Sequence, residues 1–165
     1  MSAVISPCGL YRYRLEREVC PPREGSKVFA FFGINPSTAD AALDDATVRK
    51  WRGFTARNGG HRFIVGNVFS YRATDVRELK TVAIACGPDH MDHLRDIIEA
   101  ADVLVPCWGA SGKVPGALHH VIVNTLILLQ LSGKPLLHFG LTASGDPKHP
   151  LMLGYDTPLL PWGNP

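Results

Sequence analysis

The stretch Val28-Phe29-Ala30-Phe31-Phe32-Gly33-Ile34, followed at once by Asn35-Pro36-Ser37-Thr38-Ala39-Asp40, decides the fold. Its first part is short and almost continuously apolar, which is typical of a strand buried on both faces of a parallel sheet. Comparable apolar runs occupy residues 62–68, 103–108 and 135–140. We therefore expect a short, mainly parallel central sheet with four strands, one for each run.

Segments with helical character separate these runs. Apolar side chains recur at helical intervals over residues 48–55, behind Asp45, which offers an N-cap, and Asn58-Gly59-Gly60 should end this helix. A second helix is expected from Pro88 and a third over residues 116–131. Alternating strands and helices predict a doubly wound α/β fold.

Two features indicate the edges of the sheet. Residues 10–20 alternate apolar and polar side chains with a period of two, which predicts an N-terminal antiparallel β-ribbon at an edge. Pro106 lies inside the third apolar run and has no amide hydrogen to give to a ladder. The strand that contains it should be short, bulged or at an edge.

Size and charge narrow the class of protein. The chain has 165 residues, of which 45% are hydrophobic, and a formal net charge of +2. These values predict a single domain over residues 1–165. The basic residues are scattered, so the charge neither requires nor excludes a nucleic-acid partner.

Cysteine usage and hydropathy suggest the compartment. Cys8, Cys20, Cys86 and Cys107 lack the spacing of metal ligands, which favours reduced thiols and no metal site. Neither a signal-peptide pattern nor a membrane span is recognisable. We expect a cytoplasmic monomer without a membrane partner.

The candidate site follows from the strand ends, because ligands of open parallel sheets bind beyond the carboxyl ends of the strands. After the first strand, Gly33 lets the backbone approach a ligand, and polar side chains crowd the residues that follow it. A polar turn that merely caps the next helix would have the same composition.

Two further strand ends carry informative residues. Asn67 interrupts the second apolar run, and a buried amide must find partners or cost about 1–3 kcal/mol. It is either a core Asn bonded to a nearby loop or a group that reads a nucleobase edge. The loop after the fourth run, residues 140–151, carries His149.

Taken in order, these motifs resemble an uncharacterised bacterial and phage domain family. The matching segments are NPSTAD (35–40), DDATVR (44–49), RATD (72–75) and KHPL (148–151), and the likeness spans about residues 10–162.

The motif order also resembles the uracil-DNA glycosylase superfamily. GINPS, residues 33–37, is similar to the GINPG motif of the mismatch-specific uracil/thymine branch. The segment 65–75 with Cys86-Gly87-Pro88 and residues 103–112 is similar to the small iron–sulfur branch, and KHPL resembles the closing His-Pro-Ser motif.

The second resemblance implies a three-layer α/β/α sandwich that hydrolyses the N-glycosidic bond of a uracil-like or modified base in DNA. It implies that Asn35 orients the attacking water, that Asn67 binds the base edge, and that His149 donates to the oxygen of the departing base. The residues expected to contact base or substrate besides Asn67 are Gly33, Ile34, Pro36, Ser37, Thr38, Asp40, Phe69, Tyr71 and Arg72. Leu151 and Met152 correspond to the wedge that fills the vacated duplex position.

Departures from the superfamily limit what can be transferred. Ser70 stands where a cluster ligand is expected, and the spacing of Cys8 and Cys20 does not fit, so we predict no iron–sulfur cluster and no other cofactor. Leu151 replaces the serine of the closing motif. Two alternatives to a DNA glycosylase remain: a hydrolase of free nucleotides or nucleosides, and a non-catalytic module that binds a nucleotide or nucleic acid.

Overall fold

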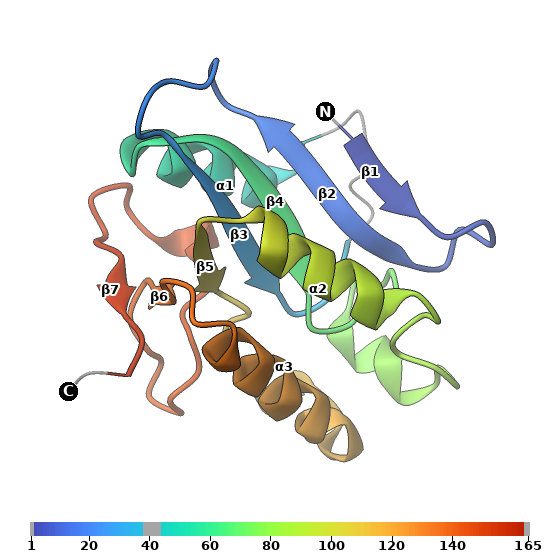
Figure 1. The fold of residues 1–165 in the computed structure, drawn as a ribbon. Coiled ribbons are helices and arrows are strands. Elements are labelled where there is room, and N and C mark those ends of the chain that lie inside the picture. Colours follow the sequence, from blue (N-terminus) through green and yellow to red (C-terminus); the bar gives the residue numbers. More distant parts are fainter. Residues whose placement is uncertain (1, 38–43, 164–165) are drawn as a thin grey trace.

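The apolar run near residue 30 forms β3 (Lys27–Gly33), an inner strand of a mixed five-stranded sheet (Figure 1). The computed structural model describes residues 2–37 and 44–163. The strand order is β1-β2-β4-β3-β5, and β3 runs parallel to both of its neighbours. The other four strands are β1 (Ser2–Ile5), β2 (Arg12–Glu18), β4 (Gly60–Asn67) and β5 (Val103–Pro106).

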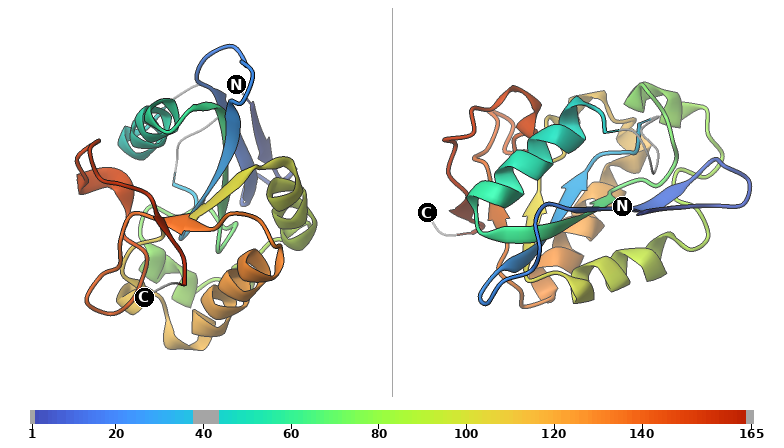
Figure 2. Two further views of the ribbon diagram at one scale, coloured as in Figure 1. Left: turned by 60° about the vertical axis from the view of Figure 1, so that its left-hand side comes forward. Right: turned by 90° about the horizontal axis from the view of Figure 1, so that it is seen from above.

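Helices cover both faces of this sheet, which confirms the α/β class (Figure 2). α1 (Ala46–Arg57) lies on one face, and α2 (His90–Ala100) and α3 (His119–Leu131) lie on the other. None of the described helices combines the length and the apolar character that a bilayer crossing requires.

The side chains of β3 explain why its sequence is apolar throughout. Phe29 and Phe31 pack in the core on the α1 side, whereas Ala30 and Phe32 pack in the core under α2 and α3. Successive side chains of a strand point to opposite faces, so a strand with a core on each side needs apolar residues at every position.

The helix boundaries follow the local signals in the sequence. Asp45 is the N-cap of α1, and its side chain accepts a hydrogen bond from the amide of Val48. The helix ends at Asn58, and Gly59 follows with φ of +75°. The predictions for this helix are confirmed. α3 begins three residues later than expected, because residues 116–118 form a 3-10 turn instead.

The expected fourth parallel strand does not form a ladder. Within residues 135–140, Leu136 makes one isolated parallel bridge to Leu104. The chain then forms β6 (Leu137–His138), which pairs antiparallel with β7 (Leu160–Pro161). β5 has four residues, ends at Pro106 and lies at the edge of the sheet, which confirms the prediction for this strand. Because β5 is so short, the segment 135–140 finds few backbone groups on it to pair with.

The N-terminal ribbon is antiparallel, as its alternation predicts. β2 pairs antiparallel with β4, and β1 pairs antiparallel with β2 on the outside. β1 rather than β2 is therefore the edge strand, and the sheet is mixed rather than mainly parallel.

A buried ion pair joins β2 to the residue that precedes the N-cap of α1. Arg17 is fully buried, and its Nε lies 2.7 Å from Oδ1 of Asp44. The second carboxylate oxygen of Asp44 lies 3.2 Å from Nη2 of Arg52. Burial raises the pKa of Asp44, but the hydrogen bonds from the two arginines outweigh it and leave the pKa below its ordinary value.

We expect Asp44→Asn to destabilise the protein by about 2 kcal/mol at pH 7, because the buried guanidinium of Arg17 loses the negative charge of Asp44. A lowered carboxyl pKa stabilises the fold above the ordinary pKa, and this contribution is lost as the pH falls through the folded pKa. The difference from wild type should therefore shrink between pH 7 and pH 2 in urea unfolding. Asp92→Asn is the control, since that carboxylate is 82% exposed beside Arg95. A difference that grows on acidification would contradict this account.

Candidate functional site

A pocket of about 150 Å³ opens at the carboxyl ends of β3 and β4, on the α1 side of the sheet. A cavity of roughly this volume is known to hold benzene, so the pocket has the size of a six-membered ring. Several residues expected at the strand ends line it: Gly33, Ile34, Asn35, Ser37, Asn67 and His149. Residues from three distant parts of the sequence thus meet at one place.

Gly33 and Asn67 form the closest approach in the pocket. They are register partners at the ends of two parallel strands. A Cβ on Gly33 would lie 2.8 Å from Oδ1 of Asn67, closer than such contacts allow. The Asn67 side chain is only 5% exposed, and it makes no hydrogen bond to any residue within 2–37 and 44–163. A buried amide that lines a pocket without a partner is available to a ligand.

Asn35 is held by the loop that follows β4. Its Nδ2 donates to the carbonyl of Ala73 at 2.7 Å and to that of Pro36 at 3.2 Å. The amide of Ala73 in turn donates to the Pro36 carbonyl at 3.1 Å. Because these bonds use the NH₂ group of Asn35, its carbonyl oxygen is the atom left to accept a hydrogen bond.

His149 reaches the pocket because its loop docks on the residues after β5. The amide of Gly109 donates to the carbonyl of Pro147 at 2.8 Å, and both the amide and the hydroxyl of Ser111 donate to Asp146. Gly109 has φ of +77°, and a Cβ there would lie 3.1 Å from the Cβ of His149. Glycine is therefore favoured at this position by its backbone conformation and by the close approach of His149.

The protonation of His149 follows from its surroundings. Burial lowers its pKa, and the negative charge of Asp45 offsets part of that effect. Nδ1 accepts a hydrogen bond from the amide of Leu151 at 3.3 Å. The neutral ring consequently carries its proton on Nε2, and near neutral pH His149 is a hydrogen-bond donor rather than a cation.

Sequence reasoning missed four other lining residues: Arg12, Asp45, Thr47 and Trp51. Asp45, for which the sequence favours a role as helix cap without excluding a place in the pocket, also accepts a 2.9 Å hydrogen bond from the hydroxyl of Ser37. Arg12 is 4% exposed, and burial lowers its pKa to about 10, so it is still a cation at neutral pH. The ring nitrogen of Trp51 donates to Sγ of Cys107 at 3.4 Å, which fixes one wall.

Comparison with known proteins identifies the family of this chain. The model of the family described as protein of unknown function (DUF1643) matches residues 12–151. The chain belongs to the DUF1643 family. Every residue that lines the pocket, from Arg12 to His149, lies within the matched span. No curated protein and no solved structure matches the chain significantly.

Three other residues predicted for the site lie elsewhere in this DUF1643 chain. Phe69 is fully buried in the core under α2 and α3, so it offers no stacking surface to a ligand. Tyr71 packs edge-on against Tyr11, and Arg72 donates to the carbonyl of Gly9. The remaining predicted residues are Pro36, which contributes its carbonyl to the loop contacts, and Thr38 and Asp40, which lie outside the described residues.

The two predicted wedge residues flank the site. Leu151 and Met152 lie in a 3-10 turn directly after His149, and their side chains are 39% and 89% exposed.

The donor groups of this DUF1643 chain do not fit an iron–sulfur cluster. Ser70 is 1% exposed, and its hydroxyl accepts a 2.8 Å hydrogen bond from the amide of Gly87. Cys107 is buried on the opposite side, against Trp51. Over the described ranges, no three His, Cys, Asp or Glu side chains are placed to hold a metal ion.

Gly33→Ala should displace the Asn67 amide and destabilise the fold by roughly 1–3 kcal/mol, the usual effect of overpacking. The physical reason is the 2.8 Å approach of the new methyl group to Oδ1 of Asn67. Thermal unfolding gives the stability, and the side-chain amide signals of Asn67 in ¹H–¹⁵N NMR give the displacement. Gly112→Ala is the matched control, because no atom lies within 4 Å of its Cβ position. Equal behaviour of the two variants would refute the close approach.

Asp45→Asn should lower the pKa of His149 further, since the carboxylate raises it in the wild type. Asn is as good an N-cap as Asp, so α1 should persist. The pKa is measured by NMR titration of the imidazole protons. Asp92→Asn changes the same charge on the exposed surface of α2 and should leave the titration unchanged. An unchanged or higher His149 pKa in Asp45→Asn would rule out the interaction.

Proposed function

We propose that the pocket binds a nucleobase and that the protein hydrolyses the N-glycosidic bond of a uracil-like or modified base in DNA. The observation that carries this proposal is the Asn67 amide, which is buried, unpartnered among the described residues and part of the wall of a ring-sized pocket. The likeness of the strand-end motifs to the uracil-DNA glycosylase superfamily supports the same reading.

Asn67 supplies the means of recognition. A side-chain amide presents a donor and an acceptor next to each other, which matches the edge of a nucleobase. Because the amide is already buried, a base without the complementary pattern would leave it unpaired, at a cost of about 1–3 kcal/mol. The wall formed by Trp51 gives the ring an apolar surface.

His149 and Arg12 stabilise the leaving group. Cleavage of the bond leaves the electron pair on the base, so negative charge develops there in the transition state. The Nε2–H of neutral His149 donates to this charge, and the guanidinium of Arg12 adds a positive potential within the same pocket. Both groups are fixed before the reaction begins, which is the condition for electrostatic stabilisation.

Asn35 and Asp45 act on the water molecule that attacks the sugar. The free carbonyl oxygen of Asn35 orients it, because the NH₂ group of that side chain is held by the backbone. The water oxygen forms a bond to the sugar C1′ as the bond from C1′ to the base breaks. The proton released by the water passes to the carboxylate of Asp45, which Ser37 and the first turn of α1 hold in place.

The exposed pair after His149 favours DNA over a free nucleoside. A base taken out of a duplex leaves a gap that apolar side chains can fill. Met152, at 89% exposure, and Leu151 are available for this role.

The test is a panel of labelled oligonucleotides, single- and double-stranded, each with one uracil or one modified pyrimidine. Abasic sites are detected by alkaline cleavage. Asn35→Ala, Asn67→Ala and His149→Ala should each lower the rate by about 100-fold or more, as removal of one fixed donor does in other enzymes. His61→Ala, at the amino end of β4, is the matched control and should retain full activity.

The possible outcomes separate the three readings. Base release from nucleosides but from no oligonucleotide would replace DNA with a small substrate. Saturable binding of a nucleobase with no bond cleavage would indicate a binding module. Abasic product that survives the Asn35 and His149 substitutions would disprove the assignment of these residues.

A further inference from the structure

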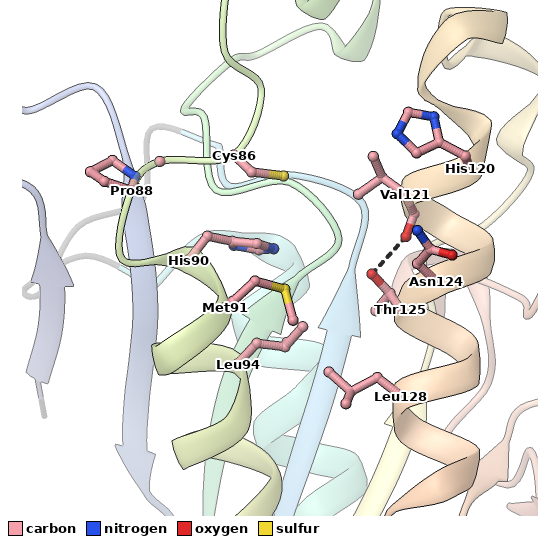
Figure 3. Close-up of a pocket in the computed structure, with 11 residues that line it drawn as sticks. Cys86, Pro88, His90, Met91, Leu94, His120, Val121, Asn124, Thr125 and Leu128 are labelled. Carbon is pink, nitrogen blue, oxygen red and sulfur yellow. Dashed lines mark hydrogen bonds between the residues drawn. The ribbon is translucent and has the colours of Figure 1, made fainter.

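A second cavity, of about 200 Å³, lies between α2 and α3, on the face of the sheet opposite the nucleobase pocket (Figure 3). Its walls are mostly apolar, and sulfur and aliphatic side chains from both helices face each other across it. The apolar lining includes Cys86, Met91, Leu94, Val121 and Leu128. The two helices leave an open cavity between these side chains, although Leu94 also packs in the core under α2 and α3.

Two buried polar residues line this cavity: Thr125 of α3, which is 4% exposed, and His90 in the first turn of α2. His90 is 6% exposed, and Figure 3 shows its ring between Cys86 and Met91. Burial lowers its pKa to about 4, so the ring is neutral at physiological pH. One ring nitrogen makes a hydrogen bond to the backbone of Val68. This bond raises the pKa of His90, so that nitrogen carries the proton and donates it. The other nitrogen of a neutral imidazole is then an acceptor.

The other buried polar residue adds a second acceptor, which also favours a ligand with a donor. The hydroxyl of Thr125 donates its hydrogen to the carbonyl of Val121 at 2.8 Å, the bond drawn as a dashed line in Figure 3, and its oxygen can still accept a hydrogen bond. Asn124 and His120 are exposed residues of α3 and lie at the rim. The interior therefore combines an apolar wall with two buried acceptors.

We propose that this cavity is a second binding site, for a small planar aromatic ligand that carries one N–H or O–H donor. The volume exceeds the roughly 150 Å³ that holds benzene in an engineered cavity, so one ring with one substituent fits. The apolar walls stabilise the ring, and the acceptor nitrogen of His90 selects a ligand with a donor. This site does not depend on the function proposed for the other pocket.

Phenol is the probe and benzene is its control without a donor. Phenol should bind saturably with a dissociation constant of about 1 mM, a usual strength for so small a ligand. Binding should shift the NMR signals of the Met91 methyl group and the His90 ring, and benzene should bind at least about tenfold more weakly, the worth of one hydrogen bond. In His90→Phe the preference for phenol should shrink.

A filled cavity provides the decisive comparison. Met91 is 44% exposed, so Met91→Trp is tolerated at the surface while its ring occupies the cavity, and phenol binding should be lost. Leu131→Trp adds the same side chain at an 80% exposed position outside the cavity and should bind phenol like the wild type. Absence of saturable shifts in the wild type, or binding that survives Met91→Trp, would overturn the proposal. Equal affinity of the wild type for phenol and benzene would overturn the role of His90.

Discussion

The pocket at the ends of β3 and β4 depends on one steric constraint, the close approach of Gly33 and Asn67 where two parallel strands end side by side. The register of β3 and β4 makes these residues partners, and only the missing side chain of glycine leaves room for the amide. A larger residue at position 33 would push the one unpartnered buried amide among the described pocket residues out of position.

Charge inside this small volume is balanced by a residue that the fold also needs. Asp45 caps α1, holds Ser37, and interacts electrostatically with both Arg12 and His149. A buried guanidinium is costly, and the negative charge of Asp45 lowers that cost for Arg12. Stability and site chemistry therefore share one side chain, and a substitution that keeps the cap but removes the charge separates the two roles.

The part of the chain that matches the DUF1643 family includes every residue that lines the pocket, but the family has no known function. Only the chemistry of the site therefore bears on what the protein does. Fixed donors, a neutral imidazole and a carboxylate form a coherent set for breaking a bond whose electrons leave on a nucleobase. The exposed turn Pro150–Met152, directly after His149, adds apolar side chains at the protein surface next to these groups. The cavity between α2 and α3 has different chemistry, with apolar walls and two acceptors, and belongs to a different kind of ligand.

The sequence alone determined what depends on neighbouring residues. Continuous apolar character marked β3, alternation marked β2, and the cap at Asp45 with the stop at Asn58 bounded α1, because these signals act within a few residues. It also indicated that strand ends carry the site, since parallel strands end at a common edge.

Only the tertiary structure decided which side chains meet there. Arg12 reaches the pocket through antiparallel pairing of β2 with β4, and Phe69 turns into the core although it follows Asn67 by two residues. The fourth apolar run forms a single bridge to β5 instead of a ladder. The physical reason is common to all three: sheet order and side-chain direction after a strand end arise from contacts between distant segments, and no local periodicity encodes them.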